Sequence, residues 1–437
     1  MRKLGFTFAL VFTFLRFSML HETLAVLTGI HTYLVLLAGV PAIFLAILGG
    51  GLPRVLQHTG ARYWFAFLGF MALSVLFSSW RGESAQVFST YVTTDFPTLL
   101  LLGGMIVTWK ECKRVVWALA LSAVSTIGMQ SLFASATSAR LAFNWGTIGN
   151  ANDYAAHLIL LLPFLLCVVL TPSAKVLKLA AMGLLVLGLF VVLKTGSRGG
   201  LIAIGAGMLM ILVRGSGRVR WILGCTAPLV LLGLVSYLPS TVTARYGDIF
   251  GNANKIVEDT TGAEESLNAR RYLLVASLEF TLHHPLFGVG PGTFSDNEGA
   301  AKVATGGHGQ WQETHNSYTQ ISSEVGIPAV LCYLVAILYT FLTLNRIIVT
   351  SRRQNIPVLA ASAFCCMLSL TTICIAMLFL SLAYRFYLPA LSGLAFALDR
   401  VMRMEFLNQP APVAAAVSPF PERFTAQPSF RPTGIAR

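Results

Sequence analysis

The sequence contains few charged residues, and this scarcity excludes an ordinary water-soluble domain. Only 11% of its 437 residues are Asp, Glu, Lys or Arg, whereas 55% are hydrophobic. A soluble domain carries about 25% charged residues, so this chain lacks the polar side chains needed to cover a surface in water. Long apolar runs recur along the sequence instead. A helix needs roughly 20 such residues to cross about 30 Å of hydrocarbon.

These apolar runs also lack the alternation of polar and apolar residues that is typical of barrel strands. Because backbone polar groups in lipid must be satisfied inside a helix or a closed barrel, the sequence predicts an all-α polytopic membrane protein. We expect about 12 transmembrane helices. Their predicted ranges are 4–20, 33–52, 63–79, 95–109, 115–134, 154–170, 177–193, 200–213, 220–238, 325–344, 357–379 and 382–398.

This pattern divides the chain into four regions. Residues 1–238 hold the first nine predicted helices, and residues 325–400 hold the last three. Between them, residues 239–324 form a long polar loop domain, which we expect to fold on itself because of its length. Residues 401–437 contain scattered prolines without a period, which predicts a largely disordered tail. We expect the apolar start of the chain to be a retained helix, not a cleaved signal peptide.

The net charge of +13 does not indicate nucleic-acid binding, because no basic stripe with interleaved aromatic residues is present. Most cations lie in every second link between the predicted helices. Cationic links stay on the cytoplasmic side of a membrane. The alternation therefore places both termini in the cytoplasm and the loop 239–324 on the opposite side.

Cysteine is absent from that outer loop. Cys112 lies in a basic link, and the other six cysteines lie in apolar runs, which argues against a disulfide framework and a cysteine-bound metal. The loop histidines His283, His284 and His308 lack the spacing of a zinc site with a nearby carboxylate. We expect no metal.

An anion site is predicted at the turn Thr195–Gly200, which precedes the helix predicted from 200. Arg198 lies on the side where cations are scarce, and at a helix N-terminus, where the helix dipole disfavours a positive charge. A bound anion would resolve both conflicts. Backbone N–H groups, two glycines that permit close approach and a guanidinium together suit a phosphate.

A second candidate, His315, lies where the outer loop returns to the membrane. We expect a helix to begin near Asn316 or Ser317, and a helix N-terminus favours the neutral imidazole. A neutral imidazole takes a proton from a hydroxyl group at neutral pH. His315 is therefore a candidate general base, although a single histidine is more often structural.

The outer loop also contains a predicted helix from Arg270 to His284, which Pro285 ends. Its apolar positions are Leu273, Leu274, Ser277, Leu278 and Leu282, and a tight turn at Gly288, Gly290 and Gly292 follows. The tandem Arg270-Arg271 at its start is either a solvated surface pair or a second cation for a diphosphate.

Three ionisable residues lie near membrane boundaries, where a structural role is expected. They are Asp95, Asp153 and Arg385. Asp153 belongs to a helix-start sequence, Asn150–Asp153, in which Asn152 or Asp153 is the expected N-cap.

The chain carries five motifs in order, which are Thr195-Gly196-Ser197-Arg198-Gly199-Gly200, Arg270, His284-Pro285-Leu286-Phe287-Gly288-Val289-Gly290-Pro291-Gly292-Thr293-Phe294, His315-Asn316-Ser317-Tyr318 and Glu324-Val325-Gly326-Ile327-Pro328. In this order they resemble the O-antigen ligase and polymerase superfamily over about residues 195–330. That family often has an aromatic residue four positions after its loop arginine, whereas this chain has Leu274 there.

The resemblance implies a multi-pass glycosyltransferase of the GT-C type in the inner membrane of a Gram-negative bacterium, with a periplasmic active site. The implied donor is O-antigen on undecaprenyl diphosphate, and the implied acceptor is the lipid A-core oligosaccharide. Transfer would invert the anomeric carbon and need no cofactor. The diphosphate would be bound by Arg198 and Arg270 with Gly199 and Gly200, and His315 would activate the acceptor. Possible supporting residues are Ser197, Arg271, Asn316, Tyr318 and Glu324.

Other functions remain open at this stage. An O-antigen polymerase or a protein O-oligosaccharyltransferase would share these motifs and differ in the acceptor. A small-anion transporter belongs to another class, and twelve helices are common among transporters. A transporter should show polar groups near the midplane, whereas the polar candidates here gather at one face and in one outer loop.

Overall fold

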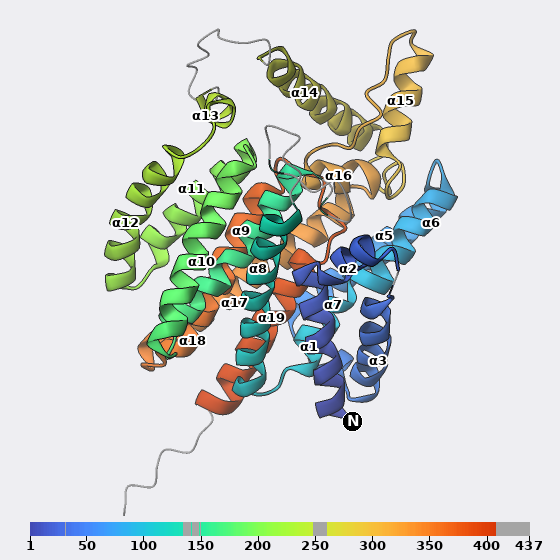
Figure 1. Ribbon diagram of the computed structural model, residues 1–437. Helices are drawn as coiled ribbons and strands as arrows, with labels where there is room; N and C mark the ends of the chain where they lie inside the picture. Colours follow the sequence, from blue (N-terminus) through green and yellow to red (C-terminus); the bar gives the residue numbers. More distant parts are fainter. Residues whose placement is uncertain (31, 134–140, 142–147, 149, 248–259, 408–437) are drawn as a thin grey trace, which may run out of the picture.

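The computed structural model describes residues 1–30, 32–133, 141, 148, 150–247 and 260–407. Over this part of the chain every regular element is helical and no strand occurs (Figure 1). The all-α prediction is thereby confirmed. Runs of Leu, Val, Ala and Phe between short polar links produce this result, because only a helix satisfies its own backbone polar groups in an apolar surrounding.

Each predicted span coincides with a helix of the structure, although the ends differ. Six described helices (α5, α8, α9, α10, α17 and α18) are long and apolar enough to cross a membrane, and the bent pair α1–α2 would make seven. The count of twelve membrane spans therefore stays a prediction. The coinciding helices are α1 (Arg2–Ser18), α3 (Leu34–Leu48), α5 (Thr59–Phe77), α7 (Pro97–Met105), α8 (Trp109–Phe133), α9 (Ala151–Leu170), α10 (Lys175–Lys194), α11 (Arg198–Arg214), α12 (Gly217–Val235), α17 (Ile327–Arg353), α18 (Pro357–Ala376) and α19 (Tyr387–Val401).

Short helices extend or connect several of these spans. The helix predicted at 95–109 ends at Met105 and measures only about 14 Å. Its helical run begins much earlier, at the start of α6, and passes through a π-wound segment. The short helices are α2 (Leu20–Thr28), α4 (Gly51–Leu56), α6 (Arg81–Thr90), the π-helices η1 (Tyr91–Asp95) and η4 (Met402–Leu407). The predicted tail beyond η4, from 408 onward, lies outside the described residues.

Two other sequence predictions of helix ends were wrong. The N-cap of α9 is Asn150, whose Oδ1 accepts the N–H groups of Asn152 and Asp153, both at 2.9 Å. The last helix, α19, begins at Tyr387 instead of 382. The preceding residues, 377–386, form a connection that is hydrogen-bonded to α16 (Ser317–Glu324), as described below.

Helices α9, α18 and α19 form the centre of the bundle. An 18-residue stretch of α9 is 83% buried, whereas the corresponding stretch of α10 is 28% buried. Helix α9 packs against α8, α10 and α18, and every residue of α19 is buried. A helix that is apolar on all sides belongs in such a central position.

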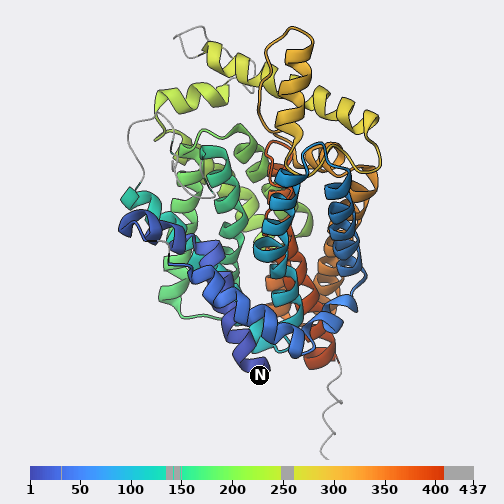
Figure 2. The same cartoon turned by 90° about the vertical axis from the view of Figure 1, so that its right-hand side faces the viewer.

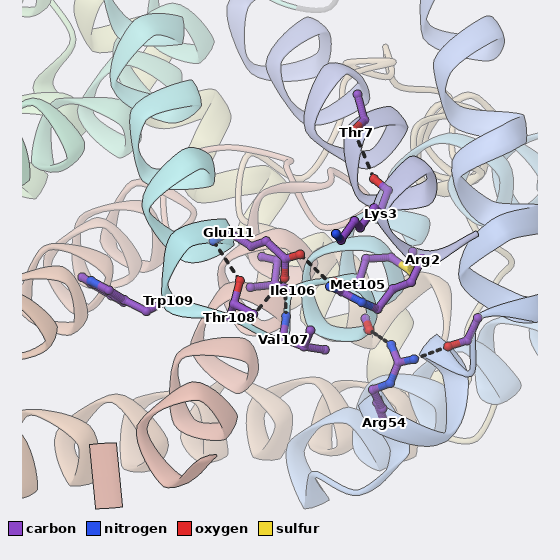
Figure 3. A network of polar contacts seen from close by, with 12 residues as sticks. Arg2, Lys3, Thr7, Arg54, Met105, Ile106, Val107, Thr108, Trp109 and Glu111 are labelled. Atoms are coloured by element: carbon purple, nitrogen blue, oxygen red, sulfur yellow. Dashed lines mark hydrogen bonds and ion pairs between the residues drawn. The ribbon is translucent and has the colours of Figure 1, made fainter. Parts of the chain in front are cut away.

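One end of the bundle holds the start of the chain together with cationic residues such as Arg54 (Figure 3). Arg2 donates to the Glu111 carboxylate at 2.7 Å, which joins the start of α1 to the start of α8. Arg54 donates to carbonyl oxygens that include one at the end of α7, and Arg400 donates to another at 2.5 Å. These links are among those predicted to share one side of the membrane.

The opposite end carries a helical head made from the outer loop (Figures 1 and 2). The predicted loop helix is present and ends before Pro285, but only Leu273 and Ser277 of its five expected apolar positions are buried. The head helices are α13 (Ser240–Gly247), α14 (Thr260–His283), α15 (Phe294–Ala304) and α16 (Ser317–Glu324).

Candidate active site

The turn between α10 and α11 presents a helix N-terminus at the head end of the bundle. Ser197 is the N-cap of α11, and its Oγ accepts the N–H of Gly200 at 3.2 Å. The N–H groups of Arg198 and Gly199 also belong to the first turn, where helix geometry provides no intrahelical acceptor. This arrangement attracts an anion, because unsatisfied N–H groups and the positive end of the helix dipole point the same way.

This N-terminus shares a small pocket with Arg270 of α14. Space at Gly199 is tight, because a Cβ at its position would lie 3.1 Å from the Cβ of Phe379. Ser197 and Arg270, 73 positions apart in the sequence, thus meet at one site, as the anion hypothesis requires. The lining residues are Asn152, Ala156, Ser197, Gly199, Gly200, Arg270, Ala376, Phe379 and Leu380.

Arg198 and Arg270 are half-buried and close enough to influence each other electrostatically. Burial lowers the pKa of Arg270, and the positive charges of Arg198 and Arg245 lower it further. In the part of the chain that the structure describes, no Asp or Glu forms an ion pair with any of these arginines. Arg271, in contrast, is exposed. Sequence reasoning did not identify Arg245, which is a cation on the side where cations are scarce.

His315 lies directly before α16, as the sequence predicted. Its backbone is left-handed (φ 51°), and its N–H donates to Ser381 Oγ at 3.0 Å. Burial lowers the pKa of its imidazole, and the positive charge of Arg270 lowers it further. The neutral form therefore prevails at neutral pH, and burial and the Arg270 charge are the causes.

Helix α16 is fixed to the connection 377–386, which also contributes Phe379 and Leu380 to the pocket. Ser317 Oγ donates to the Leu380 carbonyl at 2.6 Å and accepts the N–H of Leu382 at 2.8 Å. Residues near His315 are thereby held beside the pocket wall.

Two predicted supporting residues, Asn316 and Tyr318, hold α16 itself. Asn316 is the N-cap, and its Oδ1 accepts the N–H of Tyr318 at 3.0 Å. The Tyr318 hydroxyl donates to the Cys374 carbonyl at 2.9 Å, which fastens α16 to α18. Their contacts thus give both residues a positioning role.

Glu324 fastens the glycine-rich turn to the same helix. Its Oε2 accepts the N–H of Gly292 at 2.9 Å and the Tyr384 hydroxyl at 2.7 Å. Burial raises the pKa of this carboxyl to about 7, although the hydrogen bonds from Gly292 and Tyr384 oppose the rise. The hydrogen bonds to Gly292 and Tyr384 make Glu324 a support of the turn.

The turn itself requires glycine at position 290. Gly290 has φ 115°, and a Cβ there would lie 2.0 Å from Ser78 Oγ.

Other ionisable residues of the sequence analysis lie elsewhere. Asp95 is buried in an ion pair with Arg16 at 2.7 Å. His283, His284 and His308 are exposed. Across the described ranges, no group of three or more His, Cys, Asp or Glu side chains could hold a metal ion.

The comparison with known protein families adds one finding. Residues 183–334 match the family model described as O-antigen ligase. This segment begins within α10 and ends within α17, so it contains the turn before α11 and the helices α13 to α16 of the head. Arg198, Arg270 and His315 all lie inside it. None of the curated proteins compared with the chain matches it.

Proposed function

We propose that this member of the O-antigen ligase superfamily, matched over residues 183–334, is itself an O-antigen ligase. It transfers O-antigen from undecaprenyl diphosphate to the lipid A-core oligosaccharide and inverts the anomeric carbon. In this proposal the enzyme is a GT-C-type protein with about twelve membrane spans. Both termini are cytoplasmic, and the helical head is periplasmic.

The observation that carries this proposal is the meeting of the α11 N-terminus and Arg270 in one pocket, with His315 within reach of the Arg270 charge. A diphosphate needs fixed positive charge and N–H donors, and this pocket offers both. An acceptor hydroxyl needs a neutral base, and the lowered pKa of His315 supplies one at neutral pH.

The proposed reaction is a single displacement. The His315 imidazole takes the proton of an acceptor hydroxyl, whose oxygen attacks the anomeric carbon of the donor saccharide. The bond between that carbon and the diphosphate oxygen breaks, and undecaprenyl diphosphate leaves with the bonding electron pair. The new glycosidic bond forms on the opposite face of the sugar ring, which inverts its configuration.

The arginines and the helix N-terminus act on the leaving group. Negative charge grows on the diphosphate as the bond breaks, and donors fixed in advance stabilise it without reorganisation. One such donor contributes roughly 2.7–4 kcal/mol. The base contributes typically about 10²–10⁴-fold in rate. Loss of either should therefore reduce transfer by orders of magnitude and leave the fold intact.

The first test is lipopolysaccharide profiling in a ligase-deficient Gram-negative host that makes a compatible donor and core. The parent chain should restore high-molecular-weight bands. His315→Ala and Arg198→Ala should not, although both variants should reach the membrane in parental amounts. Arg271→Ala is the matched control and should restore the bands, because Arg271 is exposed.

The outcomes separate the alternatives. Full activity of His315→Ala would remove its assignment as the base. If the parent restores no bands despite confirmed expression and donor supply, the same profile in a polymerase-deficient host decides for a polymerase. If the protein restores long O-antigen chains in that host and transfers none to the core, the polymerase assignment replaces the ligase assignment.

A further inference from the structure

Arg245 of α13 lies beside the turn that precedes α11. The neighbouring Tyr246 donates its hydroxyl hydrogen to the Leu193 carbonyl at 2.8 Å, two residues before that turn begins. Val242, one helical turn earlier on the same helix, is only 1% exposed. The Tyr246 hydrogen bond fixes α13 against the end of α10, and the burial of Val242 shows that this face of α13 packs against the rest of the protein. Arg245 therefore has a defined place next to the anion pocket, although 46 residues separate it from Arg198 along the chain.

The Arg245 side chain is half-buried, and one nitrogen of its guanidinium lacks a hydrogen-bond partner among the described residues. Its Nε is buried and, within the described ranges, has no hydrogen-bond acceptor. Its charge acts on Arg270, which also experiences the charge of Arg198. Three positive charges thus converge without a carboxylate to offset them in the same ranges. A buried donor without an acceptor and like charges at close quarters both destabilise the empty site.

We propose that Arg245 is a third ligand of the diphosphate and that it makes the pocket selective for a diphosphate over a monophosphate. This inference rests on the proposed function. A guanidinium donates through several N–H groups in a planar fork that suits phosphate oxygens. Arg270 and the α11 N-terminus line the pocket, and the charge of Arg198 acts on Arg270. Arg245 adds a third guanidinium from an independent element, and a diphosphate carries more negative charge than a monophosphate to offset it.

Arg271 provides the contrast that makes this inference specific. It belongs to the same helical head, one residue after Arg270, but its side chain is exposed. A solvated arginine of this kind has water as its partner. The buried Nε of Arg245 has no water partner of this kind. If an Arg245 variant loses binding and an Arg271 variant does not, the loss comes from a specific contact and not from the general positive charge of the head.

The test measures binding of undecaprenyl diphosphate and of undecaprenyl phosphate to the full-length protein in detergent micelles. Arg245→Ala and Arg245→Gln should weaken diphosphate binding about tenfold or more, the loss expected for a hydrogen bond to a charged group. Binding of the monophosphate should change several-fold less. Arg245→Lys should recover part of the selectivity, and Arg271→Ala should match the parent. Thermal unfolding of each variant verifies that it is folded.

Equal diphosphate binding by the parent and Arg245→Gln would overturn the inference. So would an equal loss for both lipids, because it would remove the selectivity. Failure of the inference and failure of the proposed function are distinguishable. If the parent binds the diphosphate through Arg245 but transfers no saccharide, the ligase assignment fails and the Arg245 site stands. If the parent binds neither lipid, the diphosphate site and the role of Arg245 both fail.

Discussion

Arg270 links the two halves of the candidate site. It lines the pocket at the start of α11, and its charge also lowers the pKa of His315. A cation beside an imidazole disfavours the imidazolium form, which keeps the nitrogen lone pair available at neutral pH. The same side chain would therefore stabilise the leaving diphosphate and keep the base unprotonated.

Substituting Arg270 by Gln should shift the acidic limb of the kcat/KM profile to higher pH. Without the Arg270 charge, one of the two causes that lower the pKa of His315 is gone, so protonation of the base begins at a higher pH. The maximum should also be lower, because Arg270 no longer stabilises the leaving diphosphate. The kcat/KM profile between pH 5 and 8 reports the free enzyme. Arg271→Gln should leave the limb in place, and an unmoved limb in Arg270→Gln would contradict the electrostatic link.

The connection 377–386 and helix α16 act together as the frame of the site. Hydrogen bonds from Ser317 join them, and Glu324 joins α16 to the glycine-rich turn. Such short segments are ordered by tertiary contacts and not by their own helix propensity, since isolated helices of this length are unstable. Polar side chains in the frame therefore decide where His315 lies.

Replacing Glu324 by Gln should reduce the pH dependence of stability. The Glu324 carboxyl has a pKa of about 7 in the fold, above its ordinary value. Its contribution to stability is therefore fully present at acidic pH and is lost as the pH rises towards 7, by on the order of 2–3 kcal/mol. Thermal unfolding of the parent should show a lower Tm at pH 8 than at pH 5. The variant, which stays neutral, should show a smaller difference, and an equal difference would argue against a protonated Glu324.

The sequence predicted the membrane helices because long apolar runs are their direct signature. It also predicted the N-terminal position of Arg198 and the start of α16 near Asn316 or Ser317. It identified only part of the buried face of α14, at Leu273 and Ser277. That face meets α16 through hydroxyl groups, such as Thr281 with Ser322 at 2.8 Å, so hydrophobicity did not reveal the rest. Leu278 and Leu282 are exposed instead.

Arg245 was missed for a different reason. Arg198 was identified from two observations: it lies on the side of the membrane where cations are scarce, and it lies at a helix N-terminus. Only the first observation applies to Arg245. Its proximity to Arg198 and Arg270 depends on how α13 folds back onto the end of α10, which the Tyr246 hydroxyl fixes. No local sequence pattern encodes that long-range contact.

The molecule as a whole has two unlike ends. Cationic links and both ends of the described chain gather at one, and the helical head lies at the other (Figures 1 and 2). If the cationic end is cytoplasmic, a cysteine at exposed Ala304 of the head should react with a membrane-impermeant maleimide in intact spheroplasts. A cysteine at exposed Gln354, between α17 and α18, should react only after permeabilisation. The reverse result would invert the proposed orientation, and the parent chain controls for native cysteines.

Transfer should be insensitive to chelators. The proposed chemistry uses arginines, N–H groups and an imidazole in place of a metal ion, and the described residues offer no cluster of metal-ligating side chains. The measurement is the initial rate of transfer by the purified protein with and without EDTA. A clear loss of rate that a divalent cation restores would contradict this mechanism.

The convergence of Arg198, Arg245 and Arg270 has a consequence for turnover. In the proposed reaction the diphosphate remains on the lipid carrier, so the product presents the cations with the same phosphate groups as the donor. The site that accelerates bond cleavage therefore also binds the undecaprenyl diphosphate that remains after transfer. Departure of the spent carrier, and not the chemical step, would then set the steady-state rate, and the enzyme would work fastest where spent carrier is promptly removed from the membrane.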